Sequence, residues 1–209
     1  MSEVLNIFLM RHGKPKLPHG GRLYYGRTDY PLTEEGESCA AEMAGYLKDI
    51  KFSRVFSSDL SRARRTAELA VPAYKDKIEI VPELREINLG DWEGKSFDEV
   101  RSDWVDLFEK RGASFAAVAP PNGECFIDVQ KRAGEAFDKI LSENASGNIL
   151  IVAHGGVIWT LMCRHFDFEL NDMFFYAMGF CGIHILRRTD KMLRLVRYNW
   201  APLPTDADF

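Results

Sequence analysis

The fold of this chain is decided by the stretch Asn6-Ile7-Phe8-Leu9-Met10-Arg11-His12-Gly13. Residues 6–10 form a short, mainly apolar run that is typical of a β-strand, and the run ends abruptly at two basic residues and a glycine. A strand that runs into such a turn places its last residues at the carboxyl edge of a sheet, where open α/β folds keep their functional sites. We therefore expect Arg11 and His12 to lie at that edge.

Two further strands are expected to end in polar groups. The pattern of residues 52–56 predicts a strand that is followed by Ser57-Ser58-Asp59 and by a helix with Arg62 near its start. Residues 149–153 form a continuous apolar run, typical of a buried central strand, and they end at His154-Gly155-Gly156. Because the ends of parallel strands share one edge, residues far apart in the sequence are expected to meet in one site.

Strands and helices alternate along most of the chain, which predicts an α/β fold. Further strands are expected at residues 78–81, 182–187 and 193–198. One helix is expected at residues 34–47, with Thr33 as its N-cap, and a second helix is expected to end at residue 71, with Ser58 or Asp59 as its N-cap. Three more helices are expected at residues 96–111, 123–143 and 155–161. The expected architecture is a three-layer sandwich with a mostly parallel central sheet and helices on both faces. Residues from about 90 to 123 lack a strand pattern and are expected to form a small helical cap. No linker divides the chain, so residues 1–209 are expected to form one domain.

The composition excludes several classes of protein. Of the 209 residues, 46% are hydrophobic and 12% aromatic, which is enough to fill a core. The formal net charge of −4 argues against a nucleic-acid or polyanion binder. The four cysteines are scattered without metal-ligand spacing, as expected of core thiols in a reducing compartment. Met1-Ser2-Glu3-Val4 lacks the pattern of a signal peptide, and no window has the length of a membrane span, so we expect a cytoplasmic protein without a membrane partner.

The residue types at the expected edge suit phosphoryl transfer. This reaction needs positive charge around three phosphoryl oxygens and a nucleophile in line with the leaving group. Guanidinium groups such as those of Arg11 and Arg62 bind phosphate bidentately and stay charged. His12 can act as a neutral nucleophile if a carbonyl holds its other ring nitrogen, and nearby arginines disfavour its protonated form. His154 could then donate a hydrogen bond to the transferring group.

A leaving alkoxide also needs a proton. The sequence Glu83-Leu84-Arg85-Glu86 follows the strand expected at residues 78–81, so a carboxylate is expected at the same edge. A carboxylate beside a bound phosphate dianion is favoured in its protonated form, the form that a general acid requires. We choose Glu86 for this role because Glu83 lies closer to the strand.

Four motifs in this order resemble those of the histidine phosphatase (phosphoglycerate mutase-like) superfamily, over about residues 5 to 188. They are Leu9-Met10-Arg11-His12-Gly13, residues 57–67 with Arg62, Leu84-Arg85-Glu86 through Gly90-Asp91-Trp92-Glu93-Gly94, and Val152-Ala153-His154-Gly155-Gly156. The resemblance implies a phosphohistidine at His12, phosphate bound by Arg11, Arg62 and His154, and Glu86 as acid and then base. It also implies that no metal and no organic cofactor take part.

The resemblance extends to a first-loop motif at residues 25–33, which makes Tyr25 and Gly26, together with Gly155, candidate substrate-binding residues. Within the superfamily the chain looks most like α-ribazole-5′-phosphate phosphatases of cobalamin biosynthesis. The shared features are Tyr25-Gly26, Gly90-Asp91-Trp92-Glu93 and Pro121-Asn122-Gly123-Glu124. This likeness implies a phosphomonoesterase that hydrolyses a small phosphorylated metabolite.

Three alternatives stay open at this point: a phosphoglycerate mutase, a broad-specificity sugar-phosphate phosphatase, and a non-catalytic module that binds a phosphorylated ligand. Phosphoglycerate mutases usually carry an Asn a few residues after the Arg-His-Gly motif, whereas this chain has Lys14-Pro15-Lys16-Leu17-Pro18, which favours hydrolysis. The sequence also leaves the oligomeric state open, with a homodimer as one option.

Other polar and aromatic residues of the sequence are given no catalytic role. We interpret Arg64 and Arg65 as solvated charges, and the aromatic residues between 172 and 180 as packing residues. Trp92 and Trp104 could line the substrate entrance or pack the cap. His19, His165 and His184 are expected to be structural or surface residues.

Overall fold

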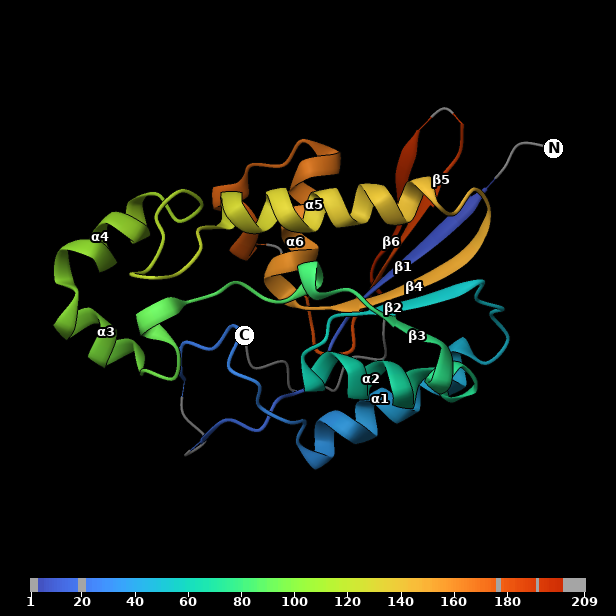
Figure 1. The fold of residues 1–209 in the computed structure, drawn as a ribbon, viewed down its shortest axis with the longest axis horizontal. Helices are drawn as coiled ribbons and strands as arrows, with labels where there is room; N and C mark the ends of the chain where they lie inside the picture. Colours follow the sequence, from blue (N-terminus) through green and yellow to red (C-terminus); the bar gives the residue numbers. More distant parts are fainter. Residues whose placement is uncertain (1–3, 19–21, 176–177, 191, 201–209) are drawn as a thin grey trace.

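The sheet of this protein has six strands in the order β3-β2-β4-β1-β5-β6 (Figure 1). The computed structural model describes residues 4–18, 22–175, 178–190 and 192–200. The strands are β1 (Leu5–Arg11), β2 (Arg54–Ser57), β3 (Ile78–Ile80), β4 (Gly147–Ala153), β5 (Ile183–Arg188) and β6 (Leu193–Trp200). The strands β1 to β4 are parallel to their neighbours among these four, whereas β5 and β6 pair antiparallel. The prediction of a mostly parallel sheet is confirmed.

The register of the central strands brings their carboxyl ends to one level. Arg11 at the end of β1 is opposite Ala153 at the end of β4, and Ser57 at the end of β2 is opposite Val152. The residues that follow these three strands therefore emerge together at one edge of the sheet.

Helices cover both faces of the sheet, as the sequence predicted. They are α1 (Glu34–Leu47) and α2 (Ser61–Ala70) on one face, and α5 (Phe126–Ser142) and α6 (Gly155–Phe166) on the other (Figure 1). Because successive side chains of a strand point to opposite faces, β1 contributes to two cores. Leu9 packs in the cluster with α5 and α6, and Met10 packs in the cluster with α1 and α2.

The start of α1 agrees with the sequence prediction, but the start of α2 does not. Neither Ser58 nor Asp59 caps α2, because Leu60 occupies the N-cap position and makes no side-chain cap hydrogen bond. The backbone N–H of Ser61 instead donates to the carboxylate of Asp29, at 2.9 Å from Oδ1. Asp29 of the first loop thus provides the hydrogen-bond acceptor that an N-cap side chain would otherwise provide.

The segment between β3 and α5 forms a helical extension at one end of the sheet (Figure 1). Its α-helices are α3 (Phe97–Asp103) and α4 (Val105–Ala113), and it also contains the short 3₁₀ helices η3 (Pro82–Leu84) and η4 (Gly90–Trp92). Two further 3₁₀ helices, η2 (Pro72–Lys77) and η5 (Leu170–Phe175), lie outside this segment. The single helix expected over 96–111 is divided at Trp104, where the backbone leaves helical geometry at φ −131° and ψ 47°. The ring of Trp92 is fully buried, so this residue packs the core. That the whole chain forms one domain with this cap as an insertion stays a prediction.

None of the helices in the described ranges is both long enough and apolar enough to cross a membrane.

Candidate active site

His12 follows β1 directly and is almost fully buried, with 2% of its surface exposed. Its ring Nδ1 lies 2.7 Å from the carbonyl oxygen of Gly13. Because a carbonyl oxygen only accepts hydrogen bonds, Nδ1 carries the ring proton and Nε2 keeps its lone pair. Burial, the charge of Arg62 and the charge of Arg11, in that order, hold the pKa of His12 well below its ordinary value. The imidazole is therefore neutral and ready to act as a nucleophile.

Arg62, the second residue of α2, is fully buried. Its guanidinium donates to the carbonyl oxygens of Thr28, at 2.9 Å, and of Gly26, at 2.5 Å. Burial lowers the pKa of Arg62, but a guanidinium remains charged at any physiological pH. Two carbonyls of the first loop thus hold a permanent cation close to His12.

Arg11, the last residue of β1, is the second guanidinium close to His12. Its guanidinium donates to the carbonyl oxygen of Met178 and lies 4.1 Å from the ring centre of Phe180. Gly155 lies against this side chain, since a Cβ built at Gly155 would be 3.4 Å from Nε of Arg11.

His154 follows β4 and is fully buried. Its Nε2 lies 2.9 Å from Oγ of Ser58, which follows β2. The ring centres of His12 and His154 are 5.0 Å apart. Burial, then the charge of Arg62, lowers the pKa of His154 well below the ordinary value, so this ring is also neutral. Three strand ends therefore meet in one site, as the sequence predicted.

Of the seven buried side-chain nitrogen atoms without a hydrogen-bond partner in the described residues, three belong to this site: Nε of Arg11, Nε of Arg62 and Nδ1 of His154. Buried polar atoms without a partner are rare in proteins, because desolvation without a hydrogen bond costs free energy. Their concentration around His12 indicates a site for a polar ligand with several acceptor oxygens. A phosphoryl group matches this donor set.

Glu86 comes to the same site from the segment after η3. Its carboxylate accepts hydrogen bonds from the backbone N–H groups of Gly156, at 3.0 Å, and of Ile87, at 3.0 Å. Gly156 lies in the first turn of α6, so the carboxylate of Glu86 meets the start of this helix. Glu83 is exposed, so of the two candidates Glu86 is the one whose carboxylate reaches the start of α6.

Tyr25 and Gly26 lie beside Arg62. The carbonyl oxygen of Gly26 accepts from Arg62, and the ring centre of Tyr25 is 5.7 Å from Cζ of the same side chain. A Cβ at Gly26 would lie 1.9 Å from the carbonyl oxygen of Ile87, so this position admits only glycine without a backbone shift. That these two residues contact the substrate stays a prediction.

The fold agrees with a comparison against known proteins. The family model described as the histidine phosphatase superfamily (branch 1) matches residues 7–201. The chain belongs to the histidine phosphatase superfamily. The resemblance inferred from the sequence is therefore confirmed, and so is the prediction that the chain is an enzyme of the phosphatase class.

Individual relatives within the superfamily carry two kinds of name. The adenosylcobalamin/alpha-ribazole phosphatase of Salmonella typhimurium is 31% identical over 77% of this chain and 79% of its own length. The probable phosphoglycerate mutase GpmB of Erwinia tasmaniensis is 31% identical over 76% of this chain and 74% of its own. The solved structure of the alpha-ribazole phosphatase from Shigella flexneri superposes with a TM-score of 0.86 at 27% identity, covering 93% of this chain and 96% of that one.

Two residues of this histidine phosphatase site were not predicted from the sequence. Ser58, expected only as a helix cap, contacts His154, and its position directly after β2 was the signal that could have identified it. Phe180, expected to be a packing residue, lies against Arg11 and has its ring centre 5.8 Å from that of His12. No strand-end motif precedes Phe180, so the sequence offered no signal.

The residues expected outside the site are found outside it. The side chains of Arg64 and Arg65 are 62% and 43% exposed and pair with surface glutamates. His184 is buried, and its Nδ1 accepts from the backbone N–H of Asn199 at 3.0 Å. His19 lies outside the described residues.

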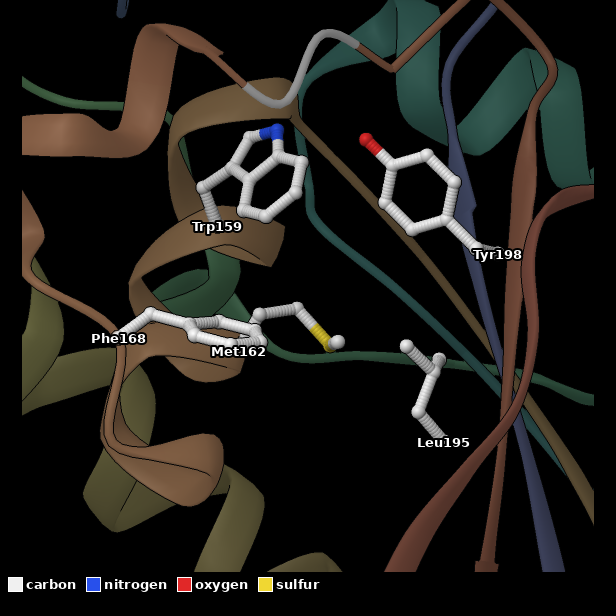
Figure 2. A pocket seen from close by; sticks show the side chains of 5 residues that line it. All are labelled: Trp159, Met162, Phe168, Leu195 and Tyr198. Carbon is white, nitrogen blue, oxygen red and sulfur yellow. The ribbon is translucent and has the colours of Figure 1, made fainter.

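A separate apolar pocket lies between α6 and β6 (Figure 2). Its volume is about 330 Å³, and it is lined by Trp159, Met162, Phe168, Leu195 and Tyr198. None of these side chains is charged, so the pocket does not suit a phosphate. Across residues 4–18, 22–175, 178–190 and 192–200, no group of three or more His, Cys, Asp or Glu side chains is arranged to hold a metal ion.

Proposed function

We propose that this histidine phosphatase hydrolyses phosphomonoesters of small metabolites through a phosphohistidine on Nε2 of His12. The observation that carries the proposal is the neutral, Nδ1-protonated His12 surrounded by three buried donors without partners. A nucleophile alone would fit many reactions. The combination with two fixed guanidinium groups fits the transfer of a dianionic group.

In the first step, Nε2 of His12 attacks phosphorus and the bond between phosphorus and the ester oxygen breaks. Arg11, Arg62 and His154 bind the phosphoryl oxygens and stabilise their charge. Protonated Glu86 donates its proton to the leaving alkoxide, so the alcohol departs neutral.

In the second step, water attacks the phosphohistidine. The carboxylate of Glu86 now accepts the proton of the attacking water, and the bond between phosphorus and Nε2 breaks. Inorganic phosphate leaves and the neutral imidazole is restored. The hydrogen bond from Nδ1 to Gly13 is retained in both steps, because it uses the nitrogen that does not react.

The chemistry is tested by trapping the phosphoenzyme. Wild-type protein mixed with a ³²P-labelled ester is expected to form an acid-labile, base-stable adduct, and His12→Ala is expected to form none. Peptide mapping of the adduct should identify His12. Phosphate found on a serine or on His154 would contradict the proposal.

We propose α-ribazole 5′-phosphate as the first substrate to test. Two observations support it: the name of the Salmonella typhimurium relative and the first-loop, Gly90–Glu93 and Pro121–Glu124 motifs. The name of the Erwinia tasmaniensis relative supports phosphoglycerate mutase as a second candidate. Against the mutase, the residues after the Arg-His-Gly motif are Lys14-Pro15-Lys16-Leu17-Pro18, without the Asn that phosphoglycerate mutases usually carry there.

A panel of phosphorylated metabolites separates these candidates. With EDTA present, α-ribazole 5′-phosphate is expected to be hydrolysed faster than 3-phosphoglycerate is isomerised. Mutase turnover with negligible hydrolysis would reverse the order, and equal hydrolysis of many sugar phosphates would indicate broad specificity. Activity lost on chelation and restored by a divalent ion would contradict a reaction driven by the arginines alone.

We also propose a cytoplasmic location without a nucleic-acid partner. All four cysteines are free thiols, which fits a reducing compartment, and the net charge of −4 disfavours binding to a polyanion.

A further inference from the structure

Two hydrogen-bond networks lie directly behind the proposed catalytic residues, and Arg27 joins them, because its backbone N–H donates to Glu93 and its guanidinium donates to Glu124. One is centred on the carboxylate of Glu93 and lies behind Arg62, and the other is centred on the guanidinium of Arg132 and lies behind Glu86. Both include a glutamate from a motif that the proposed reaction does not use, Glu93 in the first network and Glu124 in the second.

The first network folds the first loop around a half-buried anion. The carboxylate of Glu93 accepts hydrogen bonds from the backbone N–H groups of Gly26 at 3.0 Å, Arg27 at 2.7 Å, Thr28 at 3.1 Å and Leu89 at 3.1 Å. It also accepts from the hydroxyl of Thr28 at 2.6 Å. Burial alone would raise the pKa of Glu93, but these hydrogen bonds lower it below the ordinary value. Glu93 is therefore ionised.

The same loop residues hold the phosphate-binding arginine. The N–H groups of Gly26 and Thr28 point to Glu93, and their carbonyl oxygens accept from Arg62. The N–H groups of this loop thus bind the carboxylate of Glu93, and its carbonyl oxygens bind the guanidinium of Arg62. If the anion is removed, the carbonyls that orient Arg62 lose their support.

The second network holds the segment that contains Glu86 in place. Arg132 of α5 donates to the carbonyl oxygens of Glu83 at 2.6 Å, Arg85 at 2.8 Å and Glu86 at 3.0 Å. It forms a bidentate pair with Glu124 at 2.9 and 3.0 Å. Only 19% of each side chain in this pair is exposed.

Glu124 adds a contact on the C-terminal side of Glu86. Its carboxylate also accepts from the backbone N–H of Asn88 at 2.9 Å, so the pair with Arg132 holds the chain on both sides of Glu86. This support lets the carboxylate of Glu86 reach the N–H of Gly156 from a segment that has no regular secondary structure of its own.

We propose that Glu93 and Arg132 are positioning residues with separate tasks: Glu93 orients Arg62 for phosphate binding, and Arg132 orients Glu86 for proton transfer. The assignment rests on the proposed function. It predicts that the two networks fail in different ways, because charge neutralisation is needed for every ester whereas protonation is needed chiefly for esters with poor leaving groups.

The test compares Glu93→Gln and Arg132→Met by single-turnover phosphorylation of His12, with p-nitrophenyl phosphate and a primary alkyl phosphate as substrates. Glu93→Gln is expected to slow both esters by the same factor, about 10- to 100-fold, and to weaken the binding of inorganic phosphate by a similar factor. Arg132→Met is expected to slow the alkyl ester about tenfold more than the aryl ester and to leave phosphate affinity unchanged.

Matched controls separate positioning from general destabilisation. Glu99→Gln removes a hydrogen-bonded carboxylate on the surface of the cap, and Arg54→Met removes a bidentate arginine–glutamate pair at the far edge of the sheet. Both should keep the wild-type ratio of the two esters. The amount of phosphoenzyme formed per chain corrects each rate for inactive protein.

The proposal is overturned if Glu93→Gln changes the ratio of the two esters, if Arg132→Met slows both equally, or if neither variant differs from its control. Should the first two variants not fold, Thr28→Val and Arg132→Lys weaken the same networks and must show the same two patterns at smaller size. If wild-type protein forms no phosphohistidine, the proposed function fails. Calorimetric binding of inorganic phosphate to Glu93→Gln still tests the orientation of Arg62 in that case.

Discussion

His12, Arg62 and His154 are at most 2% exposed and emerge from the ends of strands or the first turn of a helix, whereas Glu86 is half-buried on an irregular segment. We call His12, Arg62 and His154 the buried half of the site and Glu86 the exposed half. In the proposed reaction the buried half binds the negative phosphoryl group, whereas the exposed half transfers a proton. Guanidinium and imidazole groups that bind phosphate gain from burial, since electrostatic interactions are stronger where water is excluded. In the proposed reaction the proton donor must instead reach the leaving group and then water, which suits a carboxylate that is only half-buried.

The largest expected effect tests whether proton transfer belongs to the exposed half alone. Glu86→Gln keeps the shape of the side chain but cannot donate or accept a proton as an acid–base group. Turnover of esters with poor leaving groups is expected to fall about 10²- to 10⁴-fold. Phosphorylation of His12 by p-nitrophenyl phosphate should fall much less, because nitrophenolate leaves without protonation.

Rapid-quench measurement of both esters decides this point. Equal slowing of the two esters would place the acid elsewhere, and Glu83→Gln would then be the next variant to measure. Asp91→Asn is a suitable control, since this carboxylate lies on the cap side and contacts Asn122.

A somewhat smaller effect is expected from the buried half. Arg62→Ala removes a guanidinium that every substrate needs, so both esters should slow by about 10²- to 10³-fold, with a ratio close to that of wild type. Steady-state and single-turnover rates with the two esters measure this. A ratio that shifts as strongly as in Glu86→Gln would show that the two halves are not separable. Arg65→Ala, on the exposed side of the same helix, is the matched control.

The ionisation of His12 gives a measurement that does not depend on turnover. Burial, then Arg62 and Arg11, lowers the pKa of His12, so the ring should stay neutral as the pH falls through the ordinary histidine value of 6.5. Arg62→Met removes one of these causes, and the pKa of His12 should rise. ¹⁵N chemical shifts of the ring across a pH titration report both the tautomer and the pKa. An unchanged or lower pKa in Arg62→Met would contradict the electrostatic account.

The smallest effect concerns a buried histidine outside both halves. Burial lowers the pKa of His184 to about 4. Between the unfolded value of 6.5 and about 4, the unfolded state binds the proton and the folded state does not, so this group's contribution to stability is present above 6.5 and is lost as the pH falls. His184→Phe should reduce the pH dependence of the free energy of unfolding in this window by about 1.4 kcal/mol per pH unit.

Urea unfolding at several pH values between 4 and 7 measures this slope in both proteins. Equal slopes in wild type and His184→Phe would show that His184 binds its proton equally in both states. The ratio of the two esters should be the same as in wild type, which separates a stability effect from the two functional halves.

The sequence predicted the strand ends well, because a strand end is a local feature. An apolar run that stops at Arg11-His12-Gly13 or at His154-Gly155-Gly156 identifies both the strand and the residues at its carboxyl edge. The parallel sheet follows from the alternation of strands and helices, and parallel register then brings these residues together. The buried half of the site was thus predicted from local sequence patterns and from the rule that the ends of parallel strands share one edge of the sheet.

The sequence could not predict contacts between segments that follow no periodic pattern. The start of α2 was wrongly assigned because the group that binds Ser61 comes from Asp29, 32 residues earlier in the chain. The helix expected over 96–111 is divided at Trp104. Periodicity describes which face of a helix is apolar, but it does not say where the backbone turns to follow a curved core.

By itself, therefore, the sequence determined the order of strands and helices, the family motifs and the identity of His12, Arg11, Arg62, Glu86 and His154 as candidates. Only the tertiary structure decided that the tautomer of His12 is set by Gly13, that Phe180 lies against Arg11, and that Glu93 and Arg132 stand behind the two halves. The physical reason is the range of the interactions. Strand and turn preferences act between neighbours in the chain, whereas a buried carboxylate or guanidinium gathers backbone groups from whichever segments the folded core brings within hydrogen-bond distance.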